Sequence, residues 1–391
     1  MSISRRRFLR GAVALGAGWT VLPKVARASL FGGGDENGVW LGGDLHCHTL
    51  YSHDVSFPTG PGNPTLGDPK NAYTLGFTPV EQITNALARK LDFLAITDHD
   101  DLSCLDDKGY VAARDAFADV LTLIPGYEHS LGHGNGTSHA GCLGVTRHFD
   151  IDTPDDAGAS ALRDAVHGDG GIFIINHPFY NATKPNDPAW GYSPSVRPDS
   201  IEVWNIAWPY RKEIFGQIAA TSENYKSLPW WESEFLAAGP MPATGGSDNH
   251  WRATAGAQGV GQPTTWVFAR DRSWPAILDG IRAGRTTVSA EPPAFGGARL
   301  FLAAALGNDE FMVGDVVPSG GSTIEVRARV VGAPGQMLRF VVDGSPLDPI
   351  TVTGPDFCAS VELPGQNRAG AEVYVDEGYW MTALSSPIYV A

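Results

Sequence analysis

The chain has 391 residues, which is too long for one ordinary hydrophobic core, so we expect two domains. Its 28 basic and 43 acidic residues give a net charge of -15 at pH 7. Negative charge of this size repels nucleic acid and anionic membranes. It also repels anionic substrates unless metal ions reverse the sign of the charge locally, so we expect a small-molecule substrate and no nucleic-acid partner.

The first 28 residues predict an export signal. They contain basic residues and no acidic one, and residues 4–10 (Ser-Arg-Arg-Arg-Phe-Leu-Arg) resemble the twin-arginine export motif. A short apolar stretch at 11–22 and the small residues at 26–28 follow, as in a cleaved signal peptide. The apolar stretch is too short and too rich in glycine and alanine to be a good membrane span. We therefore expect a mature protein in the periplasm or outside the cell, with no integral membrane association.

Strand-like and helix-like segments alternate between about residues 39 and 290. Thr78, Pro79 and Glu81 predict a helix start, because they supply a cap, a proline at the first position and a capping-box glutamate. The other predicted helices cover 154–167 and 274–283. The predicted strands are 39–45, 91–97, 120–124, 172–175, 201–204 and 241–244. This alternation is typical of a parallel sheet or a βα barrel.

The pattern changes near Glu291, where short alternating segments separated by Gly, Pro and Asp turns begin. Val342-Asp343-Gly344 is a hairpin signal. The predicted strands here are 323–331, 338–342, 359–363 and 373–375. We interpret residues 293–391 as an Ig-like antiparallel β-sandwich. The predicted division is therefore a signal peptide at 1–28, a metallohydrolase barrel at 29–292 and this sandwich.

Polar residues of metal-binding types follow the predicted strands of the first domain. In a βα barrel the carboxyl ends of the strands share one face, so these residues are expected to converge. They are His46 and His48, Asp98 to Asp100, Glu128, Asn176 and His177, Asn205, and Asp248 to His250. Each such motif is weak evidence for a functional site when it occurs alone. Six of them at strand ends are hard to account for by structural roles only.

The residue types indicate a site for divalent cations. Imidazole nitrogens and carboxylate oxygens together suit Zn, Mn or Fe. In extended backbone, positions i and i+2 point to the same side, so His46 and His48 can bind one ion. Glu128 has two oxygens and could bridge two ions. Asp98 and Asp100 flank His99, and we interpret them as solvated loop acids, with orientation of His99 or proton transfer as the alternatives.

The motifs resemble those of the polymerase-and-histidinol-phosphatase (PHP) superfamily, in the same order. They are Asp44-Leu45-His46-Cys47-His48-Thr49, Ser52-His53-Asp54, Ile96-Thr97-Asp98-His99, Gly126-Tyr127-Glu128, Asn176-His177-Pro178 and Gly246-Ser247-Asp248-Asn249-His250. The resemblance covers roughly residues 40–290. The trailing sandwich is similar to the exported branch that includes carbaryl-hydrolase-like (CehA/McbA-type) metallohydrolases.

The resemblance implies a distorted seven-stranded (β/α)7 barrel with a trinuclear metal site. The implied ligands are His46, His48, Glu128 and Asp248 for the first ion, Glu128, His139 and His177 for the second, and Asp54, His99 and His250 for the third. His53 is an alternative to Asp54, because the family often has Ser-Asp-Gly at that position. His133 is an alternative to His139, although the family pattern His-x4-Gly favours His139, which is followed by Gly144.

This ligand set implies two to three divalent ions and a metal-bridging water as the nucleophile, with Glu128, Asp248 and His99 at the reacting centre. No Gly-x-Ser-x-Gly elbow or phosphate-cradling loop is found in the sequence. We expect a metal-dependent hydrolase, and the superfamily favours a phosphoesterase. A carboxyl-ester, carbamate or amide hydrolase is the alternative that the carbaryl-hydrolase-like branch suggests. An exported metal-binding or glycan-binding protein is the third hypothesis.

Overall fold

The structure is a computed structural model. It describes residues 38–52, 76–132, 138–180, 182, 187–206, 224–236, 239–250, 259–363, 365, 367–375 and 380–391. The predicted export signal and the candidate ligands His53, Asp54 and His133 lie outside these residues. Within the part of the chain that is described, no helix is both long enough and apolar enough to cross a membrane.

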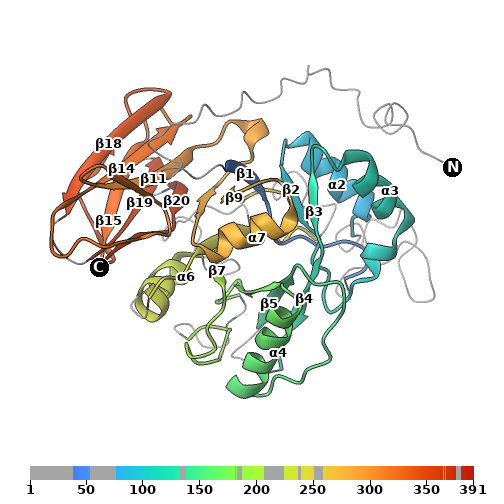
Figure 1. The fold of residues 1–391 in the computed structure, drawn as a ribbon. Coiled ribbons are helices and arrows are strands. Elements are labelled where there is room, and N and C mark those ends of the chain that lie inside the picture. Colours follow the sequence, from blue (N-terminus) through green and yellow to red (C-terminus); the bar gives the residue numbers. More distant parts are fainter. Residues whose placement is uncertain are drawn as a thin grey trace.

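The first sheet begins with three parallel strands. They are β1 (Val39–Asp44), β2 (Phe93–Ala95) and β3 (Thr122–Ile124). On the other side of β1, β9 (Thr264–Ala269) and β10 (Thr286–Ser289) continue the sheet in antiparallel pairs. Helix α7 (Trp274–Arg282) buries its apolar face in one core with side chains of β1, β2 and β9 (Figure 1). The predicted strands and helix here are confirmed, whereas β9 and β10 were not predicted.

The second sheet has the order β4-β5-β6-β7-β8. Its strands are β4 (Gly126–Ser130), β5 (His139–Leu143), β6 (Ile172–Asn176), β7 (Ser200–Asn205) and β8 (Ala243–Gly246). The pairs β4–β5 and β5–β6 are antiparallel, so the sheet is mixed and not the parallel sheet that the alternation predicted. The loop between β4 and β5 holds no helix in its described residues, and a short connection of that kind favours an antiparallel pair.

Two isolated bridges join the two sheets at the ends of their strands. Cys47, after β1, pairs with Asn249, after β8, and His99, after β2, pairs with Glu128 in β4. These bridges bring the ends of four strands together, which places the predicted ligands on one side of both sheets. The closed seven-stranded barrel stays a prediction.

The helices follow the predicted capping signals. Helix α2 (Pro79–Ala88) begins at Thr78 with a complete capping box to Glu81, as predicted. Helix α4 (Asp156–Gly168) is capped by Asp155 and buries residues at helical spacing. The remaining helical segments are η1 (Ser103–Asp106), α3 (Lys108–Phe117), α6 (Asn224–Trp230), the π-helical turn η2 (Trp231–Phe235) and η5 (Pro293–Phe295).

The C-terminal strands form two layers around one apolar core (Figure 1). One layer has the order β12 (Asp309–Met312), β11 (Arg299–Leu306), β14 (Ile324–Val331), β18 (Asp356–Leu363). The other contains β13 (Val316–Val317), β15 (Met337–Val342), β16 (Ser345–Pro346), β17 (Ile350–Thr351), β19 (Asn367–Val375), β20 (Trp380–Ser385) and β21 (Ile388–Val390). The predicted hairpin at Asp343-Gly344 is confirmed, because both residues have positive φ and Val342 pairs with Ser345.

The second of these layers is continuous with the first sheet of the chain. Strand β20 pairs with β10, so that Val288 lies opposite Leu384. The Ser386 hydroxyl accepts a hydrogen bond from Ala243 N (2.9 Å) and forms another with Thr286 Oγ1 (2.7 Å). The predicted boundary between residues 292 and 293 therefore separates β10 from β20, two paired strands of one sheet. Through Ser386 the C-terminal layers also contact the start of β8.

Candidate metal centre

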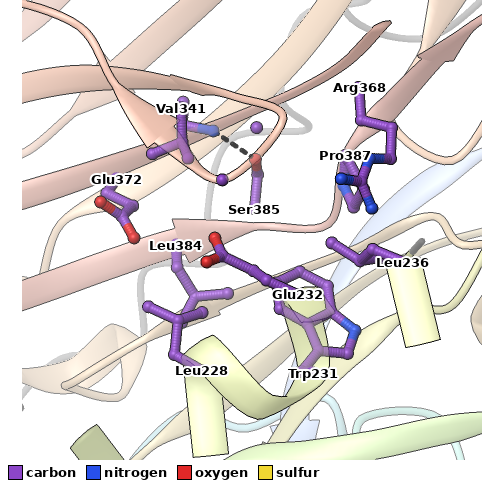
Figure 2. Close-up of a pocket in the computed structure, with 13 residues that line it drawn as sticks. Leu228, Trp231, Glu232, Leu236, Val341, Arg368, Glu372, Leu384, Ser385 and Pro387 are labelled. Atoms are coloured by element: carbon purple, nitrogen blue, oxygen red, sulfur yellow. Dashed lines mark hydrogen bonds between the residues drawn. The ribbon is translucent and has the colours of Figure 1, made fainter. Parts of the chain in front are cut away.

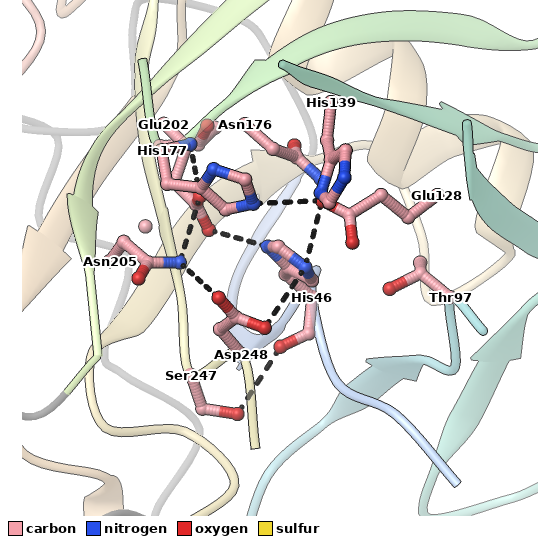
Figure 3. Close-up of polar contacts among 12 residues, drawn as sticks. His46, Thr97, Glu128, His139, Asn176, His177, Glu202, Asn205, Ser247 and Asp248 are labelled. Carbon is pink, nitrogen blue, oxygen red and sulfur yellow. Dashed lines mark hydrogen bonds and ion pairs between the residues drawn. The ribbon is translucent and has the colours of Figure 1, made fainter. Parts of the chain in front are cut away.

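The predicted ligands gather at one point where the two sheets meet. His46 and His48 follow β1, His99 follows β2, and His177 follows β6, while Glu128 lies in β4. Figure 3 shows His46, His139, His177 and Asp248 around Glu128. His139 is the first residue of β5, and Asp248 and His250 follow β8. Glu128 was expected shortly after a strand but lies within one. Every predicted ligand that the structure describes is in this cluster, and all except His139 are buried.

The carboxylate of Glu128 lies at the centre of the cluster. Its Oε1 is 3.2 Å from His46 Nε2, 3.3 Å from His139 Nδ1 and 3.0 Å from His177 Nε2. Its Oε2 is 3.4 Å from His48 Nε2 and 3.1 Å from His99 Nδ1. Five imidazole rings therefore face one fully buried carboxylate, as a bridging ligand would require.

Asp248 makes a second focus beside Glu128. Its Oδ1 is 3.5 Å from His46 Nε2, 3.3 Å from His48 Nε2 and 3.1 Å from His250 Nδ1. The ligand atoms fall into overlapping groups, each within 4.8 Å. These groups are His46-His48-Asp248, His46-Glu128-His177, His99-Glu128-His139 and His48-His99-His250.

Hydrogen bonding fixes which nitrogen of His46 faces the cluster. Its Nδ1 lies 3.0 Å from Glu202 Oε1, and a carboxylate can only accept, so we assign the proton to Nδ1. The lone pair of Nε2 then points at Glu128 and Asp248 and at His48 Nε2, 3.0 Å away. These are acceptors facing acceptors, an arrangement that is repulsive unless a cation lies among them.

A second relay fixes His48 in the same way. Ser52 Oγ donates to Asp98 Oδ1 (3.2 Å), so it accepts from His48 Nδ1 (2.7 Å), and His48 Nε2 is left for the cluster. Asp98 also accepts from the backbone N–H (2.5 Å) and the hydroxyl (2.6 Å) of Thr49. The interpretation of Asp98 as a solvated loop acid is wrong, because it is fully buried and acts through Ser52 on His48.

Glu202 is the site residue that the sequence reasoning missed. It lies in β7 and is 2% exposed, and its Oε2 accepts from His177 N (2.8 Å) and Asn205 Nδ2 (3.1 Å). Asn205 Nδ2 also reaches Asp248 Oδ2 (3.2 Å), and Asn176 Nδ2 donates to Glu128 Oε1 (2.8 Å). The available signal was a single acid between the apolar residues Ile201 and Val203 of a strand that is fully buried.

Burial and the neighbouring charges shift the pKa values of the cluster residues in opposite directions, and the neighbouring charges prevail. Burial raises the pKa of Glu128, but His46, His139 and His99 outweigh it and hold that pKa well below the usual value. Burial lowers the pKa of His46, but the carboxylates of Glu128, Glu202 and Asp248 hold it well above the usual value. The carboxylates thus favour positive charge at the inner nitrogen of His46, and a bound cation would supply that charge in place of a second ring proton.

The distances between ligand atoms fit metal coordination. Two ligands each about 2.0–2.2 Å from one ion, at octahedral or tetrahedral angles, lie about 2.8–3.6 Å apart. The nitrogen-to-oxygen distances around Glu128 and Asp248 are 3.0–3.5 Å. Glu128 Oε2 makes no hydrogen bond among the described residues, although it is buried. The geometry and the donor types of the cluster therefore fit the binding of divalent metal ions.

Comparison with known proteins finds no matching family model and no matching curated protein. One similar solved structure, from Bacteroides vulgatus, is described as a two-domain protein containing a predicted PHP-like metal-dependent phosphoesterase. It has a TM-score of 0.47 and 14% identity, and the match covers 93% of this chain and 99% of that one. Another is described as an amidohydrolase from Chromobacterium violaceum, with a TM-score of 0.34, 17% identity and coverage of 55% and 89%. Likenesses this weak do not bear on function.

Proposed function

We propose that this chain is a PHP-type metal-dependent hydrolase that binds two to three Zn, Mn or Fe ions and cleaves phosphate esters. The observation that carries the proposal is the Glu128 carboxylate, which lies 3.0–3.4 Å from nitrogens of five histidines. Export by the twin-arginine pathway to the periplasm or beyond belongs to the proposal and rests on residues 1–28 of the sequence.

The roles of the described residues are proposed from the family resemblance. His46, His48, Glu128 and Asp248 would hold one ion, Glu128, His139 and His177 a second, and His99 and His250 a third, with Asp54 outside the described residues. When bound, such ions lower the pKa of coordinated water and polarise a phosphoryl oxygen. Glu202 and the Ser52–Asp98 relay keep protons on the outer nitrogens of His46 and His48, which leaves the inner lone pairs for binding.

No side chain described near the cluster is placed to act as the nucleophile. Cys47 lies between the first two histidines, but its Sγ donates to Ala95 O (3.4 Å). Burial, with Asp44 and Asp98 nearby, raises the pKa of the Cys47 thiol well above its usual value. The Ser52 hydroxyl is committed to Asp98. Hydrolysis by water is therefore the reaction that the site supports.

Charge balance links phosphate binding to the ions. The centre and its surroundings contain five buried carboxylates, those of Asp44, Asp98, Glu128, Glu202 and Asp248. A phosphate ester would be repelled by these groups, whereas three divalent ions would carry more charge than the five carboxylates and would attract it. Phosphate esters should thus bind only to the metal-loaded protein.

The first prediction concerns Glu128. Glu128→Gln keeps the size of the side chain but removes its charge and one anionic oxygen, so the ions would repel each other with less screening. We expect loss of at least one equivalent of metal and a fall in turnover of about two to three orders of magnitude. Metal content by elemental analysis, circular dichroism, and rates on chromogenic phosphate, phosphodiester, carboxyl-ester and carbamate substrates are the measurements.

Glu362→Gln is the matched control, because Glu362 is exposed on β18, far along the chain from every proposed ligand. It should leave metal content and rates unchanged. Normal metal content and turnover in Glu128→Gln would overturn the proposed centre. Turnover of the carboxyl ester or carbamate alone would keep the hydrolase and replace the substrate class. A metal-loaded protein that cleaves none of these substrates would favour the binding-protein hypothesis.

A further inference from the structure

A second histidine–carboxylate cluster lies on the opposite side of β4 from Glu128. It consists of Asp100, His129 and His148. Successive side chains of a strand point to opposite faces, so His129 faces away from the centre that Glu128 faces. Asp100 directly follows His99, and its backbone N–H donates to Glu128 O (2.9 Å), which fixes it beside β4.

The ligand atoms of this cluster converge without bonding to each other. His129 Nδ1 lies 3.4 Å and His148 Nε2 lies 3.7 Å from the same oxygen, Asp100 Oδ1. The three atoms are within 4.8 Å of one another. Ligands about 2.0–2.2 Å from a tetrahedral ion lie roughly 3.3–3.6 Å apart, so these separations suit an ion better than direct hydrogen bonds.

The structure leaves one atom of the cluster without a hydrogen bond. His129 is 6% exposed, and its Nδ1 is buried with no hydrogen-bond partner among the described residues. Burying a nitrogen in that state is unfavourable unless a hydrogen-bond partner or an ion satisfies it. A His-Asp-His hydrogen-bond cluster would satisfy it through Asp100, but Asp100 Oδ1 accepts from Ser130 N (3.0 Å) and no bond to His129 forms.

The other two members are held in place although they are partly open to solvent. The side chains of Asp100 and His148 are 32% and 35% exposed. The ring of His148 packs on Tyr127, with centroids 4.8 Å apart, and stacks on His129 at 5.7 Å. Three fixed protein ligands with solvent on one side leave room for a water or an exogenous ligand in a fourth position.

We propose that Asp100, His129 and His148 form a separate binding site for one Zn²⁺-class divalent ion, outside the Glu128 centre. An ion there would bind two residues whose neighbours in sequence, His99 and Glu128, belong to that centre. It would therefore brace the junction of β2 and β4, and its loss should loosen the positions of both. The site stands on its own geometry and does not depend on the reaction catalysed at the main centre.

The test removes His148, because this side chain is the most exposed of the three and its loss does not open the core. The full-length chain is stripped with chelator, reloaded with Zn²⁺ alone, and analysed for bound metal in four forms. These are the wild type, His148→Ala, Glu128→Gln and the double variant. His167→Ala is the matched control, because His167 is also partly exposed and pairs with a carboxylate, Asp199 (2.7 Å), outside any cluster.

We expect His148→Ala to bind about one equivalent of Zn²⁺ less than its parent in both backgrounds, and His167→Ala to bind as much as the wild type. Asp100→Asn should repeat the loss, and asparagine tolerates the positive φ of 51° at this position. Equal binding with and without His148 would overturn the site. A loss seen only when Glu128 is intact would also overturn it, because the ion would then belong to the main centre. Failure of the Glu128→Gln rate prediction would leave this result unaffected.

Discussion

At the scale of single residues, the centre depends on protons held outside it. A histidine presents a lone pair from one nitrogen only when its other nitrogen keeps the hydrogen. Glu202 does this for His46, and Ser52 with Asp98 does it for His48. Glu202 and Ser52 contact the proposed ligands directly and Asp98 acts through Ser52, so all three position those ligands.

Glu202→Gln tests this positioning. An amide can donate to His46 Nδ1 and so turn the proton onto Nε2, where it would block metal binding. We expect metal affinity to fall by about 10- to 100-fold and turnover to recover in excess metal. Competition with a chelator measures the affinity, and circular dichroism checks the fold. Unchanged affinity would show that Glu202 has only a structural role.

The sequence revealed the ligands better than their supports. His46, His48, His99 and His177 stand in short local motifs that mark them as candidates. The supports are defined by contacts between distant strands, as with Glu202 and His46, which are 156 positions apart. No local pattern encodes such a contact, so only the folded chain reveals it.

At the scale of elements, the centre requires β1 and β8 to approach closely. Asp44 links the ends of the two strands, because its carboxylate accepts hydrogen bonds from the backbone N–H groups of His46 (3.0 Å), Ser247 (3.1 Å) and Gly261 (2.7 Å). Gly246, the last residue of β8, faces this junction. A methyl group there would lie far inside contact distance of His46 Cβ and 2.5 Å from Glu202 Oε1.

Gly246→Ala should therefore separate the strands at the centre. His46 and Glu202 cannot move apart to make room without breaking the hydrogen bond between His46 Nδ1 and Glu202 Oε1. We therefore expect about 1–3 kcal/mol of destabilisation and weaker metal binding. Chemical denaturation and metal analysis measure the two effects. Gly168→Ala is the control, because a methyl group there meets no atom within 4 Å. Equal stability of the two variants would contradict the close approach.

Elements with a strong apolar or capping pattern were predictable, including β1, β2, β6 and β8, which the ligands follow, whereas β4, which carries Glu128, was not. Strand β6 is uninterrupted apolar sequence until Asn176, and α2 carries its capping box. Strand β4 reads Gly-Tyr-Glu-His-Ser, which has no apolar alternation, because both of its faces carry polar clusters. The polar residues of these clusters occupy positions that are apolar in most strands, so the hydrophobic pattern by which strands are recognised is missing from β4.

At the scale of the whole molecule, the C-terminal layers pack against the part of the chain that carries the centre. Trp231, in the turn η2, lies in one core with Tyr374 of β19 and Leu384 of β20. A small cavity of about 30 Å³ remains between them, and Figure 2 shows Glu232, Glu372 and Arg368 in its wall. Two carboxyl groups thus share a partly buried interface between the two parts of the chain.

This interface should make stability depend on pH through Glu232. Burial and then Glu372 raise the pKa of Glu232 to about 7, although Arg368 and Arg339 act in the opposite direction. The folded chain therefore holds a proton here more tightly than the unfolded chain. Its contribution to stability is fully present below about pH 4.5 and is lost as pH rises through about 7.

Glu232→Gln is a fixed mimic of the protonated side chain, so it should remove this dependence. The wild type should lose stability relative to the variant between pH 5 and 8, by on the order of 1 kcal/mol after allowance for solvent screening. Denaturation of both proteins at several pH values gives the difference, in which the titration of all shared groups cancels. Glu234→Gln, an exposed neighbour on the same turn, should show no such trend. A difference between wild type and Glu232→Gln that stays constant across this range would mean that Glu232 is ionised in the interface throughout. The C-terminal layers would then be held in place without a contribution from a proton on Glu232.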